Sequence, residues 1–342
     1  MTQDIPVIVI TGAPNSGKGF VLKFLKKHFT DQGYSVIVIR KLAEHFIQAG
    51  KDPSRVGIVS FQDYMLEAML NEEWNAKQQL AHASKPLILV ERGGMDGAAH
   101  IPREEIEDIW NSHGRHFVHL RDERYKAVIQ LLADPSMPTA EDMRIRAAWM
   151  GTPHYAYITA SNLKEKCLRA LAQVRYFLSG EEHEARYRLL IPFERSLLPA
   201  DAQGVTITQY YVHDDGGKPP RIRSRGQDGY HIFTKGVKRK IGEMSSSDTD
   251  EPITEEMFES LQERRVLEFA VIVKTRWCFV GGNGWYFELD VLRDLQGLAI
   301  LEVEMTDPSQ KKHVRLPDGL EGNVEDITGS SLYSNKGCSR LL

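Results

Sequence analysis

VIVITGAPNSGKGF, residues 7–20, decides the fold of the first half of the chain. A short apolar run is followed by a loop bounded by Gly12 and Gly17, and then by Lys18. This order is typical of a strand, a phosphate-binding loop of the form GxxxxGK and a helix. Loop amides and the helix N-terminus offer partial positive charge to a phosphate, and the lysine reaches its outer oxygens. We therefore predict that a nucleotide binds through Gly12, Asn15, Ser16, Gly17, Lys18 and Gly19.

The residue after the lysine departs from this pattern, because Gly19 stands where such loops carry a Ser or Thr that ligates magnesium. Most phosphate contacts of the loop come from backbone groups, so binding does not depend on that hydroxyl. Any metal must then be held through water or by carboxylates elsewhere in the chain. The sequence therefore favours nucleotide binding at this loop over efficient hydrolysis there.

Length and composition narrow the remaining possibilities. The 342 residues suit two domains, and the formal net charge of −4 gives no general argument for binding nucleic acid or a membrane. The three cysteines lie far apart without a CxxC pair, which favours a reducing compartment and no zinc site. No apolar run is long enough to span a bilayer. We expect a cytoplasmic protein, and these features do not determine its oligomeric state.

Strand and helix signals alternate through residues 1–180. VIVIT, YSVIVIR and KPLILVER are typical of strands, with helical patterns over residues 17–29 and 61–83 between them. HFVHLRD and AVIQLL are candidates for further strands, and residues 161–180 form a predicted helix. Alternation of this kind predicts an α/β P-loop nucleotide-binding domain with a parallel sheet and crossover helices.

The third predicted strand ends in ILVERGGMDG, which places ionic residues beside the phosphate loop. A carboxylate at this position can hold magnesium through water or take a proton from an acceptor hydroxyl. Glu91 is the first candidate for that role and Asp96 the second. Arg92 is a candidate to contact phosphate oxygens. We therefore add Glu91 and Arg92 to the predicted nucleotide site.

After residue 180 the pattern changes, because strand-like runs follow one another and the chief helical signal is TEEMFESLQE. This predicts an α+β domain over residues 181–342, built on an antiparallel β-barrel. KRKIGEMSSSDTDEP, residues 238–252, is polar, charged and Ser-rich. We expect a mobile hairpin loop in that segment.

Ionic residues recur at spacing two within these runs, in EHEAR, RIRSR, KTR, ELD and EVE. Residues two apart on a strand share a face, so each strand has a charged face and an apolar one. Either the charged faces meet solvent and pair across strands, or they face one another inside a barrel whose outside is covered. Basic and acidic residues are sorted onto different strands, which favours the barrel. Separate acidic and basic walls suit a polyphosphate with Mg²⁺ or Mn²⁺.

The first half resembles the P-loop domains that are related to nicotinamide-riboside kinases and classed with AAA-type ATPases. VERGGMD, RYKAVIQL and GTPHYAYITASN carry the resemblance over about residues 5–180, and the GAPxxGKG spelling of the loop looks like adenylate kinases. The resemblance implies binding of ATP or GTP.

The second half resembles the CYTH domain of the triphosphate tunnel metalloenzymes over about residues 182–338, from EHEARYRLL to GNVEDITGSSLYSNKGC. The resemblance implies a tunnel in which carboxylates hold metal and basic residues hold phosphate. The implied metal ligands are Glu182, Glu184, Glu288, Asp290, Glu302 and Glu304. Four of these form the implied catalytic set, Glu182, Glu184, Glu302 and Glu304. The implied phosphate ligands are Arg186, Arg221, Arg223, Lys235, Lys274 and Arg276.

A P-loop half joined to a CYTH half resembles the TRPL translocation defect protein family. We therefore expect nucleotide binding in the first half, and binding and hydrolysis of a triphosphate compound with Mg²⁺ or Mn²⁺ in the second. Two alternatives stay open. One is a GTP-binding regulatory protein that binds a phosphoinositide, with KGVKRK at a membrane surface. The other is a small-molecule kinase for a nucleoside-like acceptor, with Glu91 as base.

Overall fold

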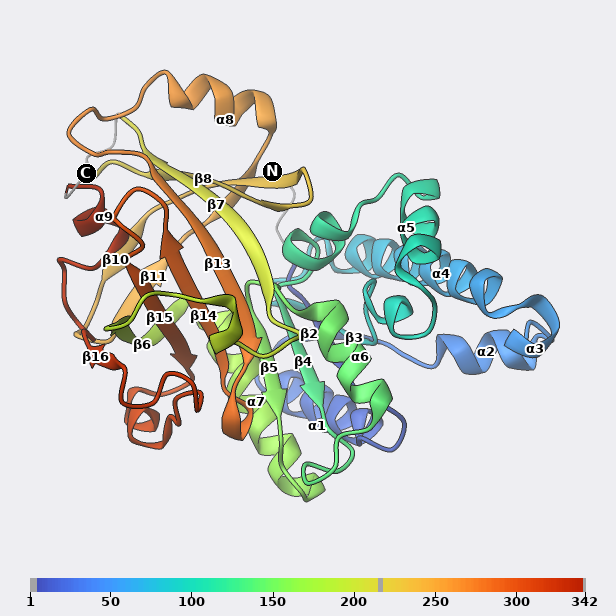
Figure 1. Ribbon diagram of the computed structural model, residues 1–342. Coiled ribbons are helices and arrows are strands. Elements are labelled where there is room, and N and C mark those ends of the chain that lie inside the picture. Colours follow the sequence, from blue (N-terminus) through green and yellow to red (C-terminus); the bar gives the residue numbers. More distant parts are fainter. Residues whose placement is uncertain (1–4, 215–217, 341–342) are drawn as a thin grey trace. The chain divides into compact units, whose positions relative to one another are not determined.

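The computed structural model describes residues 5–214 and 218–340. By its internal contacts the chain divides into two compact units, Met1–Leu178 and Ser179–Leu342. The sequence-based boundary lies two residues further on, after residue 180. One unit is a layered α/β fold and the other is a strongly curled antiparallel sheet (Figure 1).

Unit 1 is built on a parallel sheet, which confirms the predicted α/β class. Within the described residues the strand order is β2-β3-β1-β4-β5. Residues on both faces of β1 are buried, including Ile8 and Val9, and this agrees with the continuous apolar runs in the sequence. The strands are β1 (Val7–Thr11), β2 (Ser35–Ile39), β3 (Pro86–Glu91), β4 (Ala127–Leu131) and β5 (Tyr155–Ile158).

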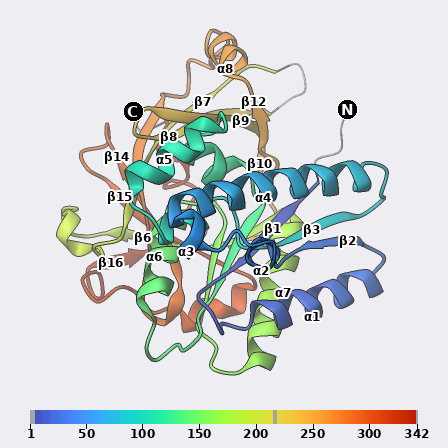
Figure 2. The same cartoon turned by 90° about the vertical axis from the view of Figure 1, so that its right-hand side faces the viewer.

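Helices cover both faces of this sheet (Figure 2). α1 (Lys18–Asp31) and α7 (Leu163–Ser179) lie on one face, where Leu22 and Val174 join the same core. α4 (Ile58–Leu80) lies on the other face. The remaining helical segments are α2 (Leu42–Gln48), α3 (Pro53–Val56), η1 (Asp96–Ala99), α5 (Arg103–Ser112), η2 (His119–Glu123) and α6 (Ala140–Trp149).

Two details of unit 1 correct the sequence-based expectation. HFVHLRD is not a strand, because His119–Glu123 form a π-helical turn. Periodicity alone does not separate a short apolar strand from a buried helical turn. The fifth strand is instead β5, whose four residues were not predicted and pair in parallel with β4. AVIQLL is confirmed as β4.

Unit 2 is built on one antiparallel sheet, which confirms the predicted second class. Within the described residues the order is β10-β11-β6-β15-β14-β13-β7-β8-β9-β12, and β16 pairs with β6. Its strands are β6 (Glu181–Leu189), β7 (Gln203–Tyr211), β8 (Arg221–Gln227), β9 (Tyr230–Gly236), β10 (Lys238–Lys240), β11 (Ser245–Asp248), β12 (Glu251–Ile253), β13 (Ile272–Val280), β14 (Tyr286–Leu292), β15 (Ala299–Met305) and β16 (Val324–Asp326). The helical segments are η3 (Arg195–Leu197), α8 (Glu255–Gln262), η4 (Gly282–Gly284), η5 (Pro308–His313) and α9 (Asn335–Cys338).

The two ends of this sheet belong to one hairpin. β9 runs into β10 and β11 runs into β12, and the two arms keep one register, since Lys238 pairs with Asp248 and Lys235 with Glu251. One arm joins β8 through β9, and the other joins β6 through β11. The sheet is therefore curled until its ends meet. The segment expected to be a mobile loop is this closing hairpin, a correction that arises because its serine backbone pairs with β6.

The outward face of the sheet is apolar and covered. Tyr187, Phe279, Phe287 and Leu289 form a buried cluster that also contains Leu320 from a connecting segment. A second cluster joins Ile222 of β8 to Phe258 of α8. Because these apolar faces are buried on the outside, the alternating ionic residues of the same strands point inward.

Candidate functional site

The phosphate loop of unit 1 has a backbone that only its glycines allow. At Gly12, with φ 141°, an added Cβ would lie 2.2 Å from the carbonyl oxygen of Leu131. Gly17, with φ 93°, precedes the first residue of α1. Larger residues at these two positions would strain or displace the loop. The loop and helix N-terminus therefore have the conformation predicted for phosphate binding.

Lys18 folds back onto its own loop. Its Nζ donates to the carbonyl oxygens of Gly12 (2.7 Å) and Ala13 (2.9 Å). Burial lowers the pKa of Lys18, and the nearby Arg92 guanidinium lowers it further. These carbonyl contacts are ones that Lys18 can exchange for phosphate oxygens. No hydroxyl follows Lys18, because Gly19 has no side chain and Phe20 has an apolar one. Phe20 is 66% exposed.

Two residues that the sequence did not single out hold the loop in place. Asp142 of α6 accepts a hydrogen bond from the Ala13 amide at 3.2 Å. Lys166 of α7 is 5% exposed and donates to the carbonyl of Ser16 at 3.1 Å and to the carbonyl of Leu132. A single lysine in an amphipathic helix carries no sequence signature for such a role, so only the fold identifies it.

The ionic residues at the end of β3 differ in their partners. Asp96 is buried and accepts hydrogen bonds from Thr11 Oγ1 and from the Gly93 amide. Arg92 donates to Glu141 Oε1 at 3.3 Å. Glu91 is half-buried and makes no hydrogen bond or ion pair with any residue in the described ranges. The Glu91 carboxylate, which was the first candidate from the sequence, therefore has no hydrogen-bond partner in the described ranges, whereas the Asp96 carboxylate supports the backbone at Gly93.

In unit 2, inward-facing charged residues lie in register across neighbouring strands. Arg186 of β6 pairs in register with Glu302 of β15, and Glu302 with Glu288 of β14. Arg276 pairs with Asp290, and Gln209 with Arg223. We call this set the ionic interior: Glu182, Glu184, Arg186, Arg221, Arg223, Lys238, Asp248, Asp250, Lys274, Arg276, Glu288, Asp290, Glu302 and Glu304.

The middle of the ionic interior is a dense ion-pair network. The Arg276 guanidinium donates to Glu288, to Asp290 (2.7 Å) and to Glu302 (2.9 Å). Burial alone would lower the pKa of Arg276, but Asp290 and Glu288 raise it well above its usual value. Lys274 is 1% exposed and pairs with Asp290. Burial lowers the pKa of Lys274 to about 8 despite that partner.

Carboxylates gather at another part of the ionic interior. Lys238 pairs with Glu182 at 2.8 Å and with Glu184 at 3.3 Å. Glu304 makes no hydrogen bond or ion pair within residues 5–214 and 218–340. Burial raises the pKa of Glu304 well above its usual value, and the nearby carboxylates Glu182, Glu288 and Glu184 raise it further. This part of the site therefore has surplus negative charge.

The basic wall on β8 has acidic partners that the sequence analysis missed. Arg221 pairs with Asp248 and with Asp250 (3.0 Å), and Arg223 pairs with Asp250 (3.2 Å). Gly236 makes room for this contact, because a Cβ there would lie 2.0 Å from Asp250 Oδ1. The spacing of two in DTD would have indicated both aspartates if the segment had been predicted as a strand.

One predicted phosphate ligand is not part of this set. Lys235 pairs in register with Ile222 of β8, whose side chain lies in the outer apolar cluster. The Lys235 amine contacts Asp214 at 3.1 Å. Lys238, three residues later, is on the inward face instead. The correction follows from strand alternation, since residues three apart on a strand point to opposite sides.

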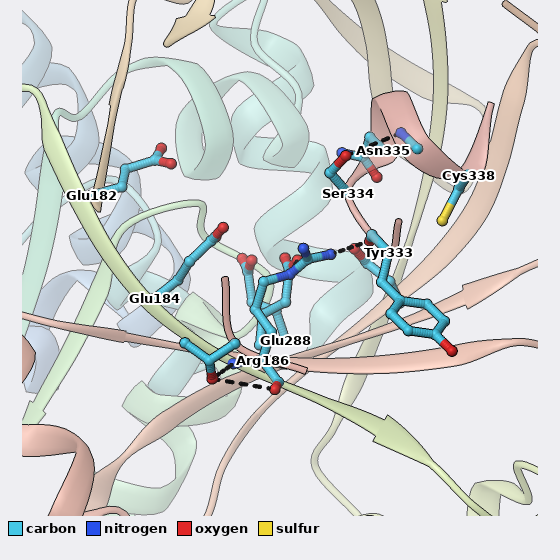
Figure 3. Close-up of polar contacts among 12 residues, drawn as sticks. Glu182, Glu184, Arg186, Glu288, Tyr333, Ser334, Asn335 and Cys338 are labelled. Atoms are coloured by element: carbon cyan, nitrogen blue, oxygen red, sulfur yellow. Dashed lines mark hydrogen bonds and ion pairs between the residues drawn. The ribbon is translucent and has the colours of Figure 1, made fainter. Parts of the chain in front are cut away.

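A cavity of about 340 Å³ opens beside the ionic interior. Glu184, Arg186, Arg221, Lys238 and Glu302 line it, together with residues of the C-terminal segment that includes Lys336. Figure 3 shows the Arg186 side chain directed toward Tyr333, whose carbonyl oxygen accepts a hydrogen bond from it, while Glu182 and Glu184 lie further along β6. Cations and carboxylates therefore line one cavity.

Two kinds of feature are absent from the described ranges. No group of three or more His, Cys, Asp or Glu side chains in these ranges is arranged to hold a metal ion. Two of the predicted ligands, Glu182 and Glu184, are instead bridged by the Lys238 amine. No helix in the described ranges is long and apolar enough to cross a bilayer.

A family model described as chromatin associated protein KTI12 matches residues 5–53, which include the phosphate loop. No curated protein matches the chain. The loop geometry and this match both support a P-loop nucleotide-binding unit. The resemblance to the TRPL translocation defect protein family stays a prediction.

Several solved structures are similar to parts of the chain. The inorganic triphosphatase NE1496 is 22% identical with a TM-score of 0.34, covering 46% of this chain and 94% of its own. A putative adenylyl cyclase from Hippeastrum, described as having a dominant triphosphatase activity, is 16% identical with a TM-score of 0.28, covering 39% and 83%. Thymidylate kinase from Ehrlichia chaffeensis is 13% identical with a TM-score of 0.35, covering 50% and 99%.

Replacing Lys166 with Met should weaken nucleotide binding. The substitution removes the amine that ties the loop carbonyl of Ser16 to the end of β4, and leaves buried carbonyls unpaired at a cost of about 1–3 kcal/mol. If roughly 1.4 kcal/mol of this falls on the bound state, the Kd for ATP or GTP rises about tenfold. Titration calorimetry on the intact chain measures it. Lys164→Met, exposed on the same helix, is the control, and equal affinities in both variants would contradict the role.

Replacing Glu304 with Gln should stabilise the metal-free protein at pH 8 and weaken its response to Mn²⁺. A carboxyl whose folded pKa is raised binds its proton more tightly when folded, so the free energy of unfolding falls as pH rises above about 4.3. Gln removes that loss but also removes a predicted metal ligand. Thermal unfolding between pH 5 and 8, with and without MnCl2, tests both effects, with exposed Glu321→Gln as control. A variant that is less stable at pH 8 and keeps the full Mn²⁺ shift would refute this assignment.

Proposed function

We propose that unit 2 binds a polyphosphate in its ionic interior and hydrolyses it with Mg²⁺ or Mn²⁺, while unit 1 binds ATP or GTP. The observation that carries the proposal is the cavity of about 340 Å³ between buried basic and acidic side chains. Charged groups leave water at a large cost unless they are paired or serve a charged ligand. Glu184, Arg186, Arg221 and Lys238 give the cavity both signs of charge, which a polyphosphate with a divalent cation matches, and Tyr211, Pro219, Val237 and Met244 complete its wall.

The basic residues would hold the phosphates by exchanging partners. Arg221 and Arg186 now donate to carboxylates and to a backbone carbonyl, and phosphate oxygens accept the same hydrogen bonds. Arginine presents a planar set of donors that suits such bidentate contacts. Lys238 and Lys336 line the same cavity and add charge. The substrate phosphates would thus take the place of carboxylates that now pair with these cations, rather than bind to cations that have no partner.

The carboxylates fit a hard divalent cation in chemistry. The Glu304 side chain makes no ion pair in the described ranges, and burial and the neighbouring carboxylates raise its pKa although Lys238 opposes this. Glu182, Glu184 and Glu304 would hold the ion, with Glu302 beside them, once Lys238 moves from Glu182 and Glu184 toward a phosphate. A metal ion bound there would polarise a phosphoryl oxygen and lower the pKa of a bound water. Arg186 and Arg276 keep Glu302 ionised for this purpose, because burial would raise the pKa of Glu302 but these cations lower it overall.

A phosphoinositide-binding role uses the same cavity and is supported by the closing hairpin. Ile241 is 55% exposed at its tip, next to exposed Arg239 and Lys240. An apolar side chain flanked by cations suits the surface of an anionic membrane. In this alternative the ionic interior would bind a phosphorylated headgroup without cleaving it, and GTP in unit 1 would regulate the binding.

Phosphate release separates these functions. The intact chain should release phosphate from tripolyphosphate, ATP, GTP or thiamine triphosphate with Mg²⁺ or Mn²⁺. Joint replacement of Glu302 and Glu304 with Gln should reduce this about 10²-fold or more, since metal stabilisation contributes several kcal/mol. Lys18→Ala should leave tripolyphosphate hydrolysis intact. Activity that survives the double substitution would overturn the hydrolase proposal. Pelleting with phosphoinositide vesicles, lost in Arg221→Ala and unaccompanied by phosphate release, would favour the binding role.

Polyphosphate hydrolysis should fall as pH rises above about 8. Lys274 loses its proton near that pH in the free protein, and the ionic interior then has one fewer cation for phosphate. Because the unfolded lysine has a pKa of about 10.4, the free energy of unfolding should rise over the same pH range while kcat/KM falls. Hydrolysis rates and urea unfolding, both measured from pH 6 to 10, test whether kcat/KM falls over the range in which the free energy of unfolding rises. Lys274→Arg should remove the fall, and a fall that persists in this variant would assign it to another group.

A further inference from the structure

Unit 1 contains a second cavity, of about 300 Å³, at the end of β3. Most of its wall is apolar and comes from Phe61, Met65, Leu66 and Met69 of α4 and from Ile106 of α5. Its polar residues are few: Glu91, Arg92, Asp96, His100 and Gln62. An apolar enclosure of this volume with a few polar groups is typical of a small-molecule site. The cavity of unit 2 differs, because charged residues such as Arg186, Arg221 and Glu302 line it.

The polar end of this cavity lies beside the phosphate loop. Glu91 pairs in register with Ile10 of β1, and the Arg92 amide donates to the Ile10 carbonyl at 3.2 Å. Glu91 and Arg92 are both close enough to Lys18 to influence its pKa. A molecule in the cavity would therefore meet the outer phosphates of a nucleotide that Lys18 holds.

The polar groups at this end are not equivalent. Asp96 is tied to Thr11 and to the Gly93 amide, and Arg92 to Glu141 and His100. Glu91 has no such partner in the described ranges and is half-buried. Arg92 has φ 68°, a backbone conformation rare for residues with a side chain. An uncommitted carboxylate next to an unusual backbone position is typical of a reacting group rather than of a structural one.

Gln62 adds a recognition element to the apolar wall. Its side chain is 9% exposed and makes no hydrogen bond with any residue in the described ranges. Gln62 lines the cavity, so its amide is available to a ligand there. The amide offers both a donor and an acceptor, so it suits the polar edge of a ring whose faces contact Phe61 and Met65.

We propose that this cavity binds the acceptor of a phosphoryl transfer, a nucleoside-like molecule with an apolar ring body, one polar ring edge and a free hydroxyl. The proposal rests on nucleotide binding in unit 1 and is independent of hydrolysis in unit 2. The acceptor hydroxyl oxygen attacks the terminal phosphorus of the bound nucleoside triphosphate, and a new O–P bond forms. The bond to the bridging oxygen breaks, and the nucleoside diphosphate leaves with the electron pair. Glu91 takes the hydroxyl proton and releases it to solvent.

The test is label transfer from γ-³²P ATP and γ-³²P GTP to the natural ribonucleosides and deoxyribonucleosides, with Mg²⁺ and the intact chain. At least one nucleoside should become labelled. Glu91→Gln should lower kcat at least tenfold with little change in KM for the nucleoside, since it removes the base and keeps the shape of the site. Met65→Trp should raise that KM or abolish binding by filling the cavity. Trp74→Ala, 62% exposed on the same helix, is the matched control and should transfer label at the wild-type rate.

Results that overturn the proposal are distinct from failure of the other assignments. If ATP or GTP binds in calorimetry but no nucleoside is labelled, or if Glu91→Gln transfers label at the wild-type rate, the acceptor site is refuted while nucleotide binding stands. If neither nucleotide binds, the premise in unit 1 fails instead. Because Met65→Trp can disturb packing, thermal unfolding of this variant is compared with Trp74→Ala. A Met65→Trp variant that folds normally and keeps its KM for the nucleoside would also refute the proposal that the nucleoside binds in this cavity.

Discussion

Charged side chains leave water only with compensating partners, and unit 2 depends on that constraint. Its outward strand faces are apolar and covered, so the alternate residues must face inward whatever their charge. The chain meets this requirement by placing three carboxylates around Arg276 and by pairing the buried Lys274 with Asp290. Removing one partner from such a pair costs about 3–5 kcal/mol. The Glu304 side chain has no ion pair in the described ranges, and it is one of the carboxylates that we propose to hold an external cation.

In unit 1 the groups that need partners are backbone carbonyl oxygens of the phosphate loop. The phosphate loop is tightly turned, and its carbonyl oxygens point where two lysines can reach them. Lys18 donates to Gly12 and Ala13, and Lys166 donates to Ser16 and to the end of β4. A bound phosphate can take over the first set of contacts, whereas the second set lies on another helix and stays with the protein. The loop can therefore change partners without losing its shape.

Much of this arrangement could be predicted from the sequence, because two of its rules are local. The GxxxxGK spacing indicated the loop, and charges at spacing two indicated the ionic faces of the strands. Residues that depend on distant pairing were missed: Asp248 and Asp250 lie in a Ser-rich segment whose strands pair with β6, β9 and β10. Lys235 was predicted from the family resemblance, which did not establish which residues of β9 face inward. Asp142, Lys166 and the apolar cavity beside Glu91 depend on how helices pack, which no local pattern records.

The position of β6 has a consequence for how unit 2 forms. It is the first strand of the unit, yet its neighbours β11, β15 and β16 all come later in the chain, and Glu302 of β15 meets Arg186 across more than a hundred intervening residues. During synthesis on the ribosome, the charged face of β6 emerges before any of these neighbours exists. Topologies dominated by such distant pairing fold slowly and expose unpaired strand edges meanwhile. The alternating charges of β6 would keep that edge hydrated during the wait, and so protect the nascent chain from aggregation.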